Sequence, residues 1–126
     1  MLGKFLMVAL GGGLGSMARY GMYIAMDKYT IKTFPVATLT VNLVGCFLVG
    51  LLFGFTSKAT AGGAPTGWAL FLGTGFCGGF TTFSAFALDN NNLFKNEQGL
   101  AALAYTIFSV VIGILLCRLG MGLSGN

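Results

Sequence analysis

Residues 59–88 read ATAGGAPTGWALFLGTGFCGGFTTFSAFAL and contain no charged side chain. Residues 33–57 and 98–117 are also free of charge, and residues 5–26 are interrupted only by Arg19. Because about 20 mostly apolar residues cross a bilayer, each of these tracts is long enough to do so. The sequence therefore predicts an all-α membrane protein with four transmembrane helices, at approximately 4–26, 34–57, 67–88 and 99–120.

The composition agrees with a membrane protein. Of the 126 residues, 56% are hydrophobic and only 8% are charged, whereas soluble domains carry about a quarter charged residues. This excludes an ordinary soluble enzyme. The loops between the predicted spans are short, so consecutive helices are expected to be antiparallel neighbours in a single domain, 1–126. The Lys and Arg residues are spread over the loops and form no basic stripe, which argues against a nucleic-acid partner.

Residues that bind transition metals are scarce. The chain has no histidine, and its cysteines, Cys46, Cys77 and Cys117, each fall in a different predicted span. Their spacing matches neither a disulfide framework nor a zinc site. We interpret them as small apolar packing residues.

The loop charges give the chain little reason to choose one orientation in the membrane. The cations on the side of the termini and middle loop are balanced by those on the opposite side: Lys4, Lys58 and Arg118 against Lys28, Lys32 and Lys95. Since an excess of Lys and Arg sets topology, this balance predicts insertion in both orientations and assembly as an antiparallel, dual-topology homodimer.

The third span contains a cluster of glycines. Residues 73–78, GTGFCG, match the glycine pattern of a dinucleotide-binding loop, but that motif has meaning only between a strand and a helix, and here its flanks are apolar sequence of membrane length. Two interpretations remain open. The glycines either break the third helix, which in lipid requires protein or a bound ion to satisfy the backbone, or they allow very close helix packing.

Aromatic and hydroxyl side chains follow the glycines. Phe76, Phe80 and Phe83 recur at helical spacing, and a packing or lipid-facing stripe is the simplest explanation of this pattern. Thr81, Thr82 and Ser84 lie between them, however, and a lipid-facing helix has no need of three hydroxyls in four residues.

Polar residues also recur at four-residue steps in the other spans. Thr38 and Asn42 share a face of the second span, and Tyr105 and Ser109 share a face of the fourth. Either they form interhelical hydrogen bonds, worth about 1 kcal/mol each, or they contact a transported species. Arg19 costs about 3 kcal/mol in hydrocarbon, so we expect it to reach the interface or to face a water-filled vestibule.

No Asp or Glu is expected well inside a span, and the buried polar groups would be mainly donors and positive ring edges. This favours a small anion or a neutral molecule as the transported species. A small multidrug-type exporter resembles this chain in having four spans. That class, however, needs a glutamate embedded in the membrane, and none is expected here. A structural membrane subunit would explain the glycines and leave Asn42 and the hydroxyls unexplained.

Three segments are similar to bacterial fluoride channels of the CrcB (Fluc) type, and the resemblance runs nearly end to end: GGGLGSMARY (11–20), TVNLVG (40–45) and GFCGGFTTFS (75–84). It implies a passive fluoride channel of the bacterial cytoplasmic (inner) membrane, built as an antiparallel homodimer. The family often has a threonine where this chain has Ala85, and more polarity at Ala87.

The resemblance also implies roles for particular residues. The fluoride pathway would consist of Asn42, Phe80, Phe83, Thr38, Tyr105 and Ser109. Arg19 would lie in the vestibule, and the backbone carbonyls of Gly75 and Gly78, at the helix break, would bind a structural sodium ion on the dimer axis.

Overall fold

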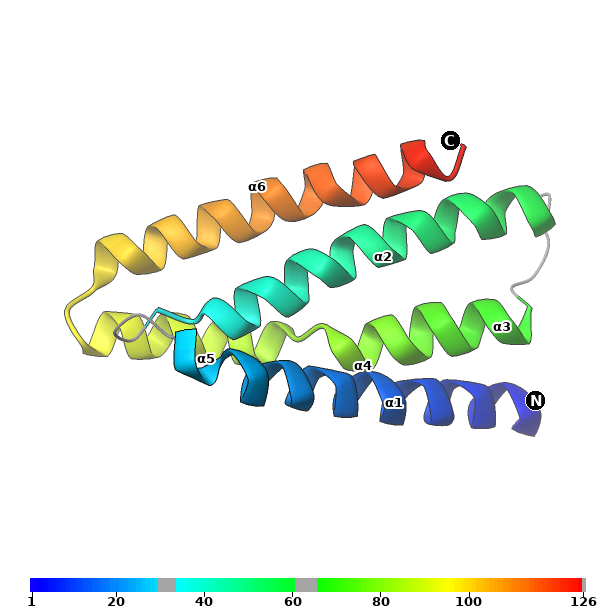
Figure 1. Ribbon diagram of the computed structural model, residues 1–126, viewed down its shortest axis with the longest axis horizontal. Coiled ribbons are helices and arrows are strands. Elements are labelled where there is room, and N and C mark those ends of the chain that lie inside the picture. The colour runs from blue at the N-terminus through cyan, green and yellow to red at the C-terminus, as the bar shows by residue number, and fades with distance from the viewer. Residues whose placement is uncertain (30–33, 61–65, 126) are drawn as a thin grey trace.

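The computed structural model describes residues 1–29, 34–60 and 66–125, which form four long helical segments and no strand (Figure 1). The loops expected around residues 30–33 and 61–65 lie outside this part of the chain. The helical elements follow in chain order: α1 (Leu2–Met26), the short turn η1 (Asp27–Tyr29), α2 (Val36–Thr60), α3 (Gly67–Ala69), the π-helix η2 (Leu70–Cys77), α4 (Gly78–Phe80), α5 (Phe83–Lys95) and α6 (Gly99–Leu123). The prediction of an all-α fold is confirmed.

Within the part of the chain that the structure describes, three segments are both long and apolar enough to cross a membrane: Val36–Ala59, Gly67–Lys95 and Gly99–Leu123. The first predicted span, 4–26, coincides with α1, whose 25 residues exceed the length that a bilayer requires. Its many glycines and Arg19 make α1 less apolar than the others, so its role as a span stays a prediction. Figure 1 shows α1 lying alongside the third segment over most of its length.

The third segment packs against α1 through backbone contacts. A Cβ atom on Gly11 or Gly15 of α1 would overlap the carbonyl oxygen of Phe71 or Phe76, respectively, and one on Gly79 would overlap the Gly12 carbonyl. Only glycine allows two helices to approach so closely. The expectation of close packing at the glycine cluster is therefore confirmed.

The helices α2 and α6 form the other close pair, and they also approach each other at glycines. A Cβ atom on Gly50 would overlap the Cys117 carbonyl, and one on Gly120 would overlap the Phe47 carbonyl. Because the glycines come from both helices, the approach is close at more than one level along the pair.

The third segment is also broken, but beyond the glycines. Gly75 lies within the π-helix and Gly78 begins α4 with helical φ and ψ angles of −63° and −38°. The backbone becomes extended at Thr81 (φ −85°, ψ 159°) and Thr82 (φ −153°, ψ 119°), and α5 begins at Phe83. The predicted break in the third helix is present, three residues after Gly78.

The third segment extends further than expected. The sequence predicted its end near Leu88 and a loop from Asp89 to Gln98, whereas α5 continues to Lys95. The Asn90 side chain supports this continuation, because its Nδ2 donates to the Phe86 carbonyl one turn earlier (3.1 Å). Asp89 thus lies in the helical segment Gly67–Lys95 and not in a loop, so the predicted loop boundary is wrong.

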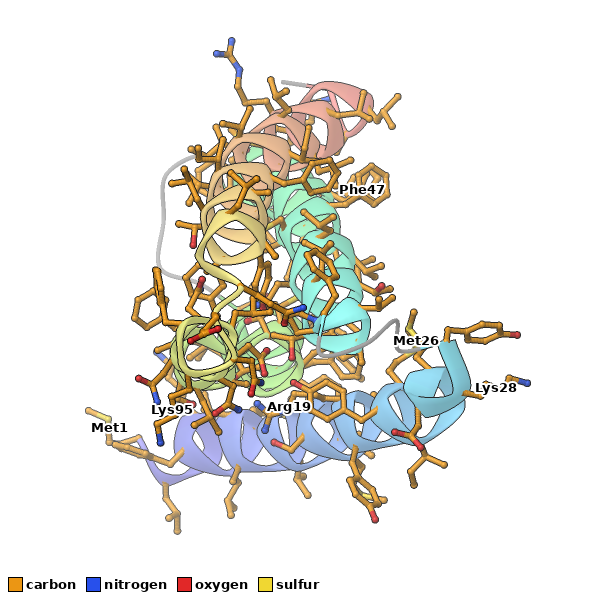
Figure 2. All side chains as sticks on the ribbon, turned by 90° about the vertical axis from the view of Figure 1, so that its left-hand side faces the viewer. Met1, Arg19, Met26, Lys28, Phe47 and Lys95 are labelled. Carbon is orange, nitrogen blue, oxygen red and sulfur yellow. The ribbon has the colours of Figure 1, made fainter. Side chains whose placement is uncertain are left out.

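Few side chains are fully buried. The largest are Tyr105, Leu93 and Val41, and Leu93 and Tyr105 form a small core between α5 and α6 with Ala102. Figure 2, a view along the bundle, shows most apolar side chains pointing outward from the four segments. Such an apolar exterior suits lipid or a second protein chain better than water.

Candidate functional site: the broken third segment

The break is held by Asn42 of α2. Its Oδ1 accepts a hydrogen bond from the Thr82 N–H (2.8 Å), and its Nδ2 donates to the Thr82 carbonyl (3.1 Å). The Thr82 hydroxyl in turn accepts from the Ala85 N–H (3.2 Å) and caps α5. One side chain therefore satisfies the extended residue that interrupts the helix, as non-helical backbone at membrane depth requires.

These bonds release two backbone carbonyls. In a continuous helix the Thr82 N–H would donate to the Gly78 carbonyl, and the Ala85 N–H would donate to the Thr81 carbonyl. Both N–H groups donate to side-chain oxygens instead. The Gly75 carbonyl, by contrast, accepts a hydrogen bond from the Gly78 N–H. Of the two carbonyls named from the sequence, only that of Gly78 is released.

A cavity of about 470 Å³ lies beside the break, between α2, the third segment and α6. Gly78, Thr81 and Thr82 line it, together with Asn42 and Ser109. The Ser109 oxygen is buried and has no hydrogen-bond partner within the described residues. The remaining lining is mostly apolar, so the few polar groups stand out as sites for a ligand.

The rings of Phe83 and Phe86 also line this cavity. Their ring centroids are 5.7 Å apart, and the Phe83 ring is 81% exposed. Phe86 also packs edge-on against the Tyr105 ring, at a centroid distance of 5.0 Å and an interplanar angle of 70°.

Phe80, which the resemblance assigned to the pathway, is not part of the cavity lining. It is buried and stacks on Phe76, with ring centroids 5.8 Å apart and an interplanar angle of 13°. Sequence reasoning missed Phe86, although it follows Phe83 at helical spacing. The sequence pattern was counted as one continuous helix through Phe76, Phe80 and Phe83. The extended Thr81 and Thr82 interrupt that helix, so Phe80 and Phe83 do not share one face, and the helical pattern restarts at Phe83.

Thr38 and Tyr105 form a separate polar cluster with two further residues that the sequence did not identify. The Tyr105 hydroxyl donates to the Asp89 carboxyl (3.3 Å), and the Thr38 hydroxyl also hydrogen-bonds to that carboxyl. The hydroxyl oxygens of Thr38 and Tyr23 are 3.0 Å apart. Side chains from α1, α2, α5 and α6 thus meet at one point, where Asp89 is paired with hydroxyl donors.

Arg19 lines a second cavity, of about 420 Å³, between α1 and α5. Tyr20, Tyr23, Thr82 and Ser84 share this lining. Figure 2 shows the Arg19 side chain directed from α1 toward the third segment, while Lys28 points away from the bundle. Because Thr82 borders both cavities, the break lies between the cavity that contains Arg19 and the cavity that contains Asn42.

The chain also matches a protein-family model. The model of the family described as CrcB-like protein, Camphor Resistance (CrcB), matches residues 6–121. The chain belongs to this CrcB family.

Curated relatives of this CrcB chain cover nearly all of it. It is 44% identical over 114 residues to the fluoride-specific ion channel FluC of Flavobacterium psychrophilum, covering 90% of each chain. It is 49% identical over 110 residues to FluC of Paracoccus denitrificans, covering 87% of this chain and 85% of the relative. It is 41% identical over 120 residues to FluC 2 of Bacillus cereus, covering 95% and 96%. These relatives are named as ion channels and not as enzymes.

Proposed function

We propose that this CrcB-family chain is a fluoride-selective ion channel that exports fluoride passively and so gives fluoride resistance. The single observation that supports this most directly is the buried Ser109 hydroxyl, which has no hydrogen-bond partner among the residues that the structure describes. It lies in a cavity that also contains the Asn42 amide and two phenylalanine rings. All of these can face an anion with a donor or with a positive ring edge. The names of the relatives specify fluoride among the anions.

The proposed pathway uses Asn42, Phe83, Phe86 and Ser109 in the larger cavity. Asn42 engages Thr82 through its oxygen and one N–H, so the other N–H of the same amide remains available for the ion. Thr38 and Tyr105 extend the polar track toward Asp89. Phe80 stacks on Phe76 and does not line the larger cavity, so it is not part of this pathway.

Selectivity in such a pathway is a problem of desolvation. A small, strongly hydrated anion has to exchange water for protein donors without being trapped, and several weak sites in series achieve this better than one strong site. Arg19 stands apart in the smaller cavity, where it raises the local anion concentration without binding the ion in the narrow part. A negative cell interior then drives fluoride outward, by about 2.3 kcal/mol per charge for each 100 mV.

We also propose an antiparallel, dual-topology homodimer in the bacterial cytoplasmic (inner) membrane. The balance of loop cations supports it, and so does the exposure of Phe83, a cavity-lining ring that is 81% exposed in a single chain. A second chain would cover this ring and close the open side of the cavity.

The structural sodium ion is part of the same proposal. Sodium prefers oxygen ligands, and the released carbonyls of Gly78 and Thr81 supply two per chain beside the cavity. Two chains related by a twofold axis would supply four. The ion would compensate the carbonyl dipoles that the break exposes. Gly75 fits this role less well, because its carbonyl is already hydrogen-bonded.

Reconstituted liposomes test the proposed function. Protein in liposomes loaded with potassium fluoride should release fluoride rapidly when valinomycin is added, while liposomes loaded with potassium chloride should release chloride at the rate of protein-free vesicles. Equal release of both anions would overturn the selectivity, and no fluoride release by folded protein would overturn the channel.

A further inference from the structure

The first two residues of the Asn90-Asn91-Asn92 run differ in their surroundings. Asn91 is exposed, whereas Asn90 is half-buried and lies between α5 and α6. Its Nδ2 donates to the Phe86 carbonyl (3.1 Å), and its Oδ1 accepts from the Thr106 hydroxyl (3.0 Å). Asn90 thus connects the cavity-lining Phe86 to the facing helix.

The hydrogen-bond inventory fixes the direction of both bonds. A carboxamide has one donor end and one acceptor end, and the Phe86 carbonyl can only accept, so the Nδ2 end must face Phe86. The Oδ1 end then faces the Thr106 hydroxyl, which is the donor in this contact. The same hydroxyl also donates to the Ala102 carbonyl (2.9 Å), so its one proton is shared between Asn90 and its own helix. Loss of Asn90 would let Thr106 turn entirely to its own helix.

This contact lies next to the aromatic contact of the pathway. Phe86 and Asn90 are one helical turn apart on α5, and their partners on α6, Tyr105 and Thr106, are consecutive. Figure 1 shows that α5 and α6 are adjacent near their connection and diverge away from it. The ring edge that Phe86 presents to the cavity therefore depends on how this end of α5 is held against α6.

We propose that Asn90 and Thr106 are positioning residues that set the orientation of the Phe86 ring in the ion pathway. This inference rests on the proposed fluoride channel and adds two residues that line neither cavity. The hydrogen bond fixes the spacing of α5 and α6, the spacing fixes the edge-on contact between Phe86 and Tyr105, and that contact fixes the ring edge offered to the anion. Without it the ring has room to rotate, and conduction falls although no ion-contacting group has been removed.

Two pairs of variants test the proposal. Thr106→Val keeps the volume and removes the donor, whereas Thr106→Ser keeps the donor. Asn90→Leu removes both bonds, whereas Asn91→Leu is a matched change at the exposed neighbour. We expect Thr106→Val and Asn90→Leu to slow fluoride release from liposomes by roughly fivefold. This factor corresponds to the free energy of about one interhelical hydrogen bond. Thr106→Ser and Asn91→Leu should stay within about twofold of the wild type, because both variants keep the interhelical hydrogen bond between Asn90 and Thr106.

A second measurement does not depend on transport. 4-Fluorophenylalanine at position 86 reports on the ring by ¹⁹F NMR, and its resonance should shift or broaden in Thr106→Val and return in Thr106→Ser. The elution of each variant on size-exclusion chromatography should match the wild type. Slower release with an unchanged resonance, or equal release by Thr106→Val and Thr106→Ser, would overturn the positioning role. If the wild-type protein releases no fluoride, the proposed function fails, while the NMR result still decides whether Asn90 and Thr106 orient the ring.

Discussion

The Asn42 carboxamide hydrogen-bonds to both the N–H (2.8 Å) and the carbonyl (3.1 Å) of Thr82, so a side chain of α2 pairs with the backbone of the third segment. This pairing occurs where that backbone is extended and has no helical partners. Asn42 is therefore both a wall of the larger cavity and the residue that maintains the break. A substitution here is expected to affect structure and conduction together.

Asn42→Leu should lower stability and abolish fluoride release. It leaves the Thr82 N–H and carbonyl without partners, and each lost bond is worth about 1 kcal/mol in membrane proteins. Thr40→Val on the same helix is the control, because the Thr40 hydroxyl donates to the Val36 carbonyl of its own helix (2.8 Å). Thermal unfolding in detergent and release from liposomes measure the two effects. Unchanged stability of Asn42→Leu would contradict the role of this side chain in the break.

The sequence predicted the helices well because membrane-length tracts without charges have few other structures available. It placed the break too early, since the glycines that suggested it serve the contact with α1, where Gly11 and Gly15 meet the backbone of the third segment. That contact is tertiary, and no local pattern distinguishes it from a flexible glycine run. The sequence predicted a loop from Asp89 onward, whereas α5 continues to Lys95, and Asn90 stabilises this helix by donating to the Phe86 carbonyl.

The phenylalanines on the two sides of the break should respond differently to substitution by isoleucine. Phe83→Ile and Phe86→Ile keep apolar bulk in the cavity and delete a ring edge, so fluoride release should fall by at least about tenfold, the equivalent of 1.4 kcal/mol. Phe80→Ile should instead cost about 1–3 kcal/mol of stability through its lost stacking on Phe76, with release largely preserved. Release by protein that elutes as the wild type does is the measurement. The reverse pattern, with Phe80 critical and Phe86 dispensable, would return the pathway to the residues expected from the resemblance.

Glycines that meet the third segment should not tolerate alanine. Gly15→Ala would drive a methyl group into the Phe76 carbonyl, whereas a Cβ atom on Gly13, in the same helix, would meet nothing within 4 Å. We expect Gly15→Ala to destabilise the protein by about 1–3 kcal/mol or more and Gly13→Ala to be neutral or slightly stabilising, since alanine is the better helix former. Thermal unfolding of both variants tests this. Equal midpoints would mean that α1 and the third segment are not in direct backbone contact.

Dual topology should be visible by cysteine labelling. In a variant with the native cysteines replaced, Gly3→Cys provides a thiol near the N-terminus at a position with open space around it. A membrane-impermeant maleimide should label part of the population from outside intact cells and the remainder only after permeabilisation. Two lysines added within residues 57–67 should drive one orientation and abolish fluoride release unless an oppositely biased copy is expressed with it. Labelling of Gly3→Cys from one side only would contradict the dual-topology dimer.

Sodium removal is the last test, and it follows from the carbonyls of Gly78 and Thr81. Because the Thr82 and Ala85 N–H groups donate to side chains, these carbonyls lack their helical partners, and both residues line the cavity. Leaving them without a ligand in a membrane interior costs several kcal/mol for each group. Exhaustive exchange of sodium for N-methyl-D-glucamine should therefore slow fluoride release and lower the unfolding temperature, and sodium added back should restore both. The same exchange performed with potassium in place of sodium separates a site selective for sodium from one that accepts any monovalent cation. Full release and an unchanged unfolding temperature in N-methyl-D-glucamine would show that protein groups alone satisfy the break.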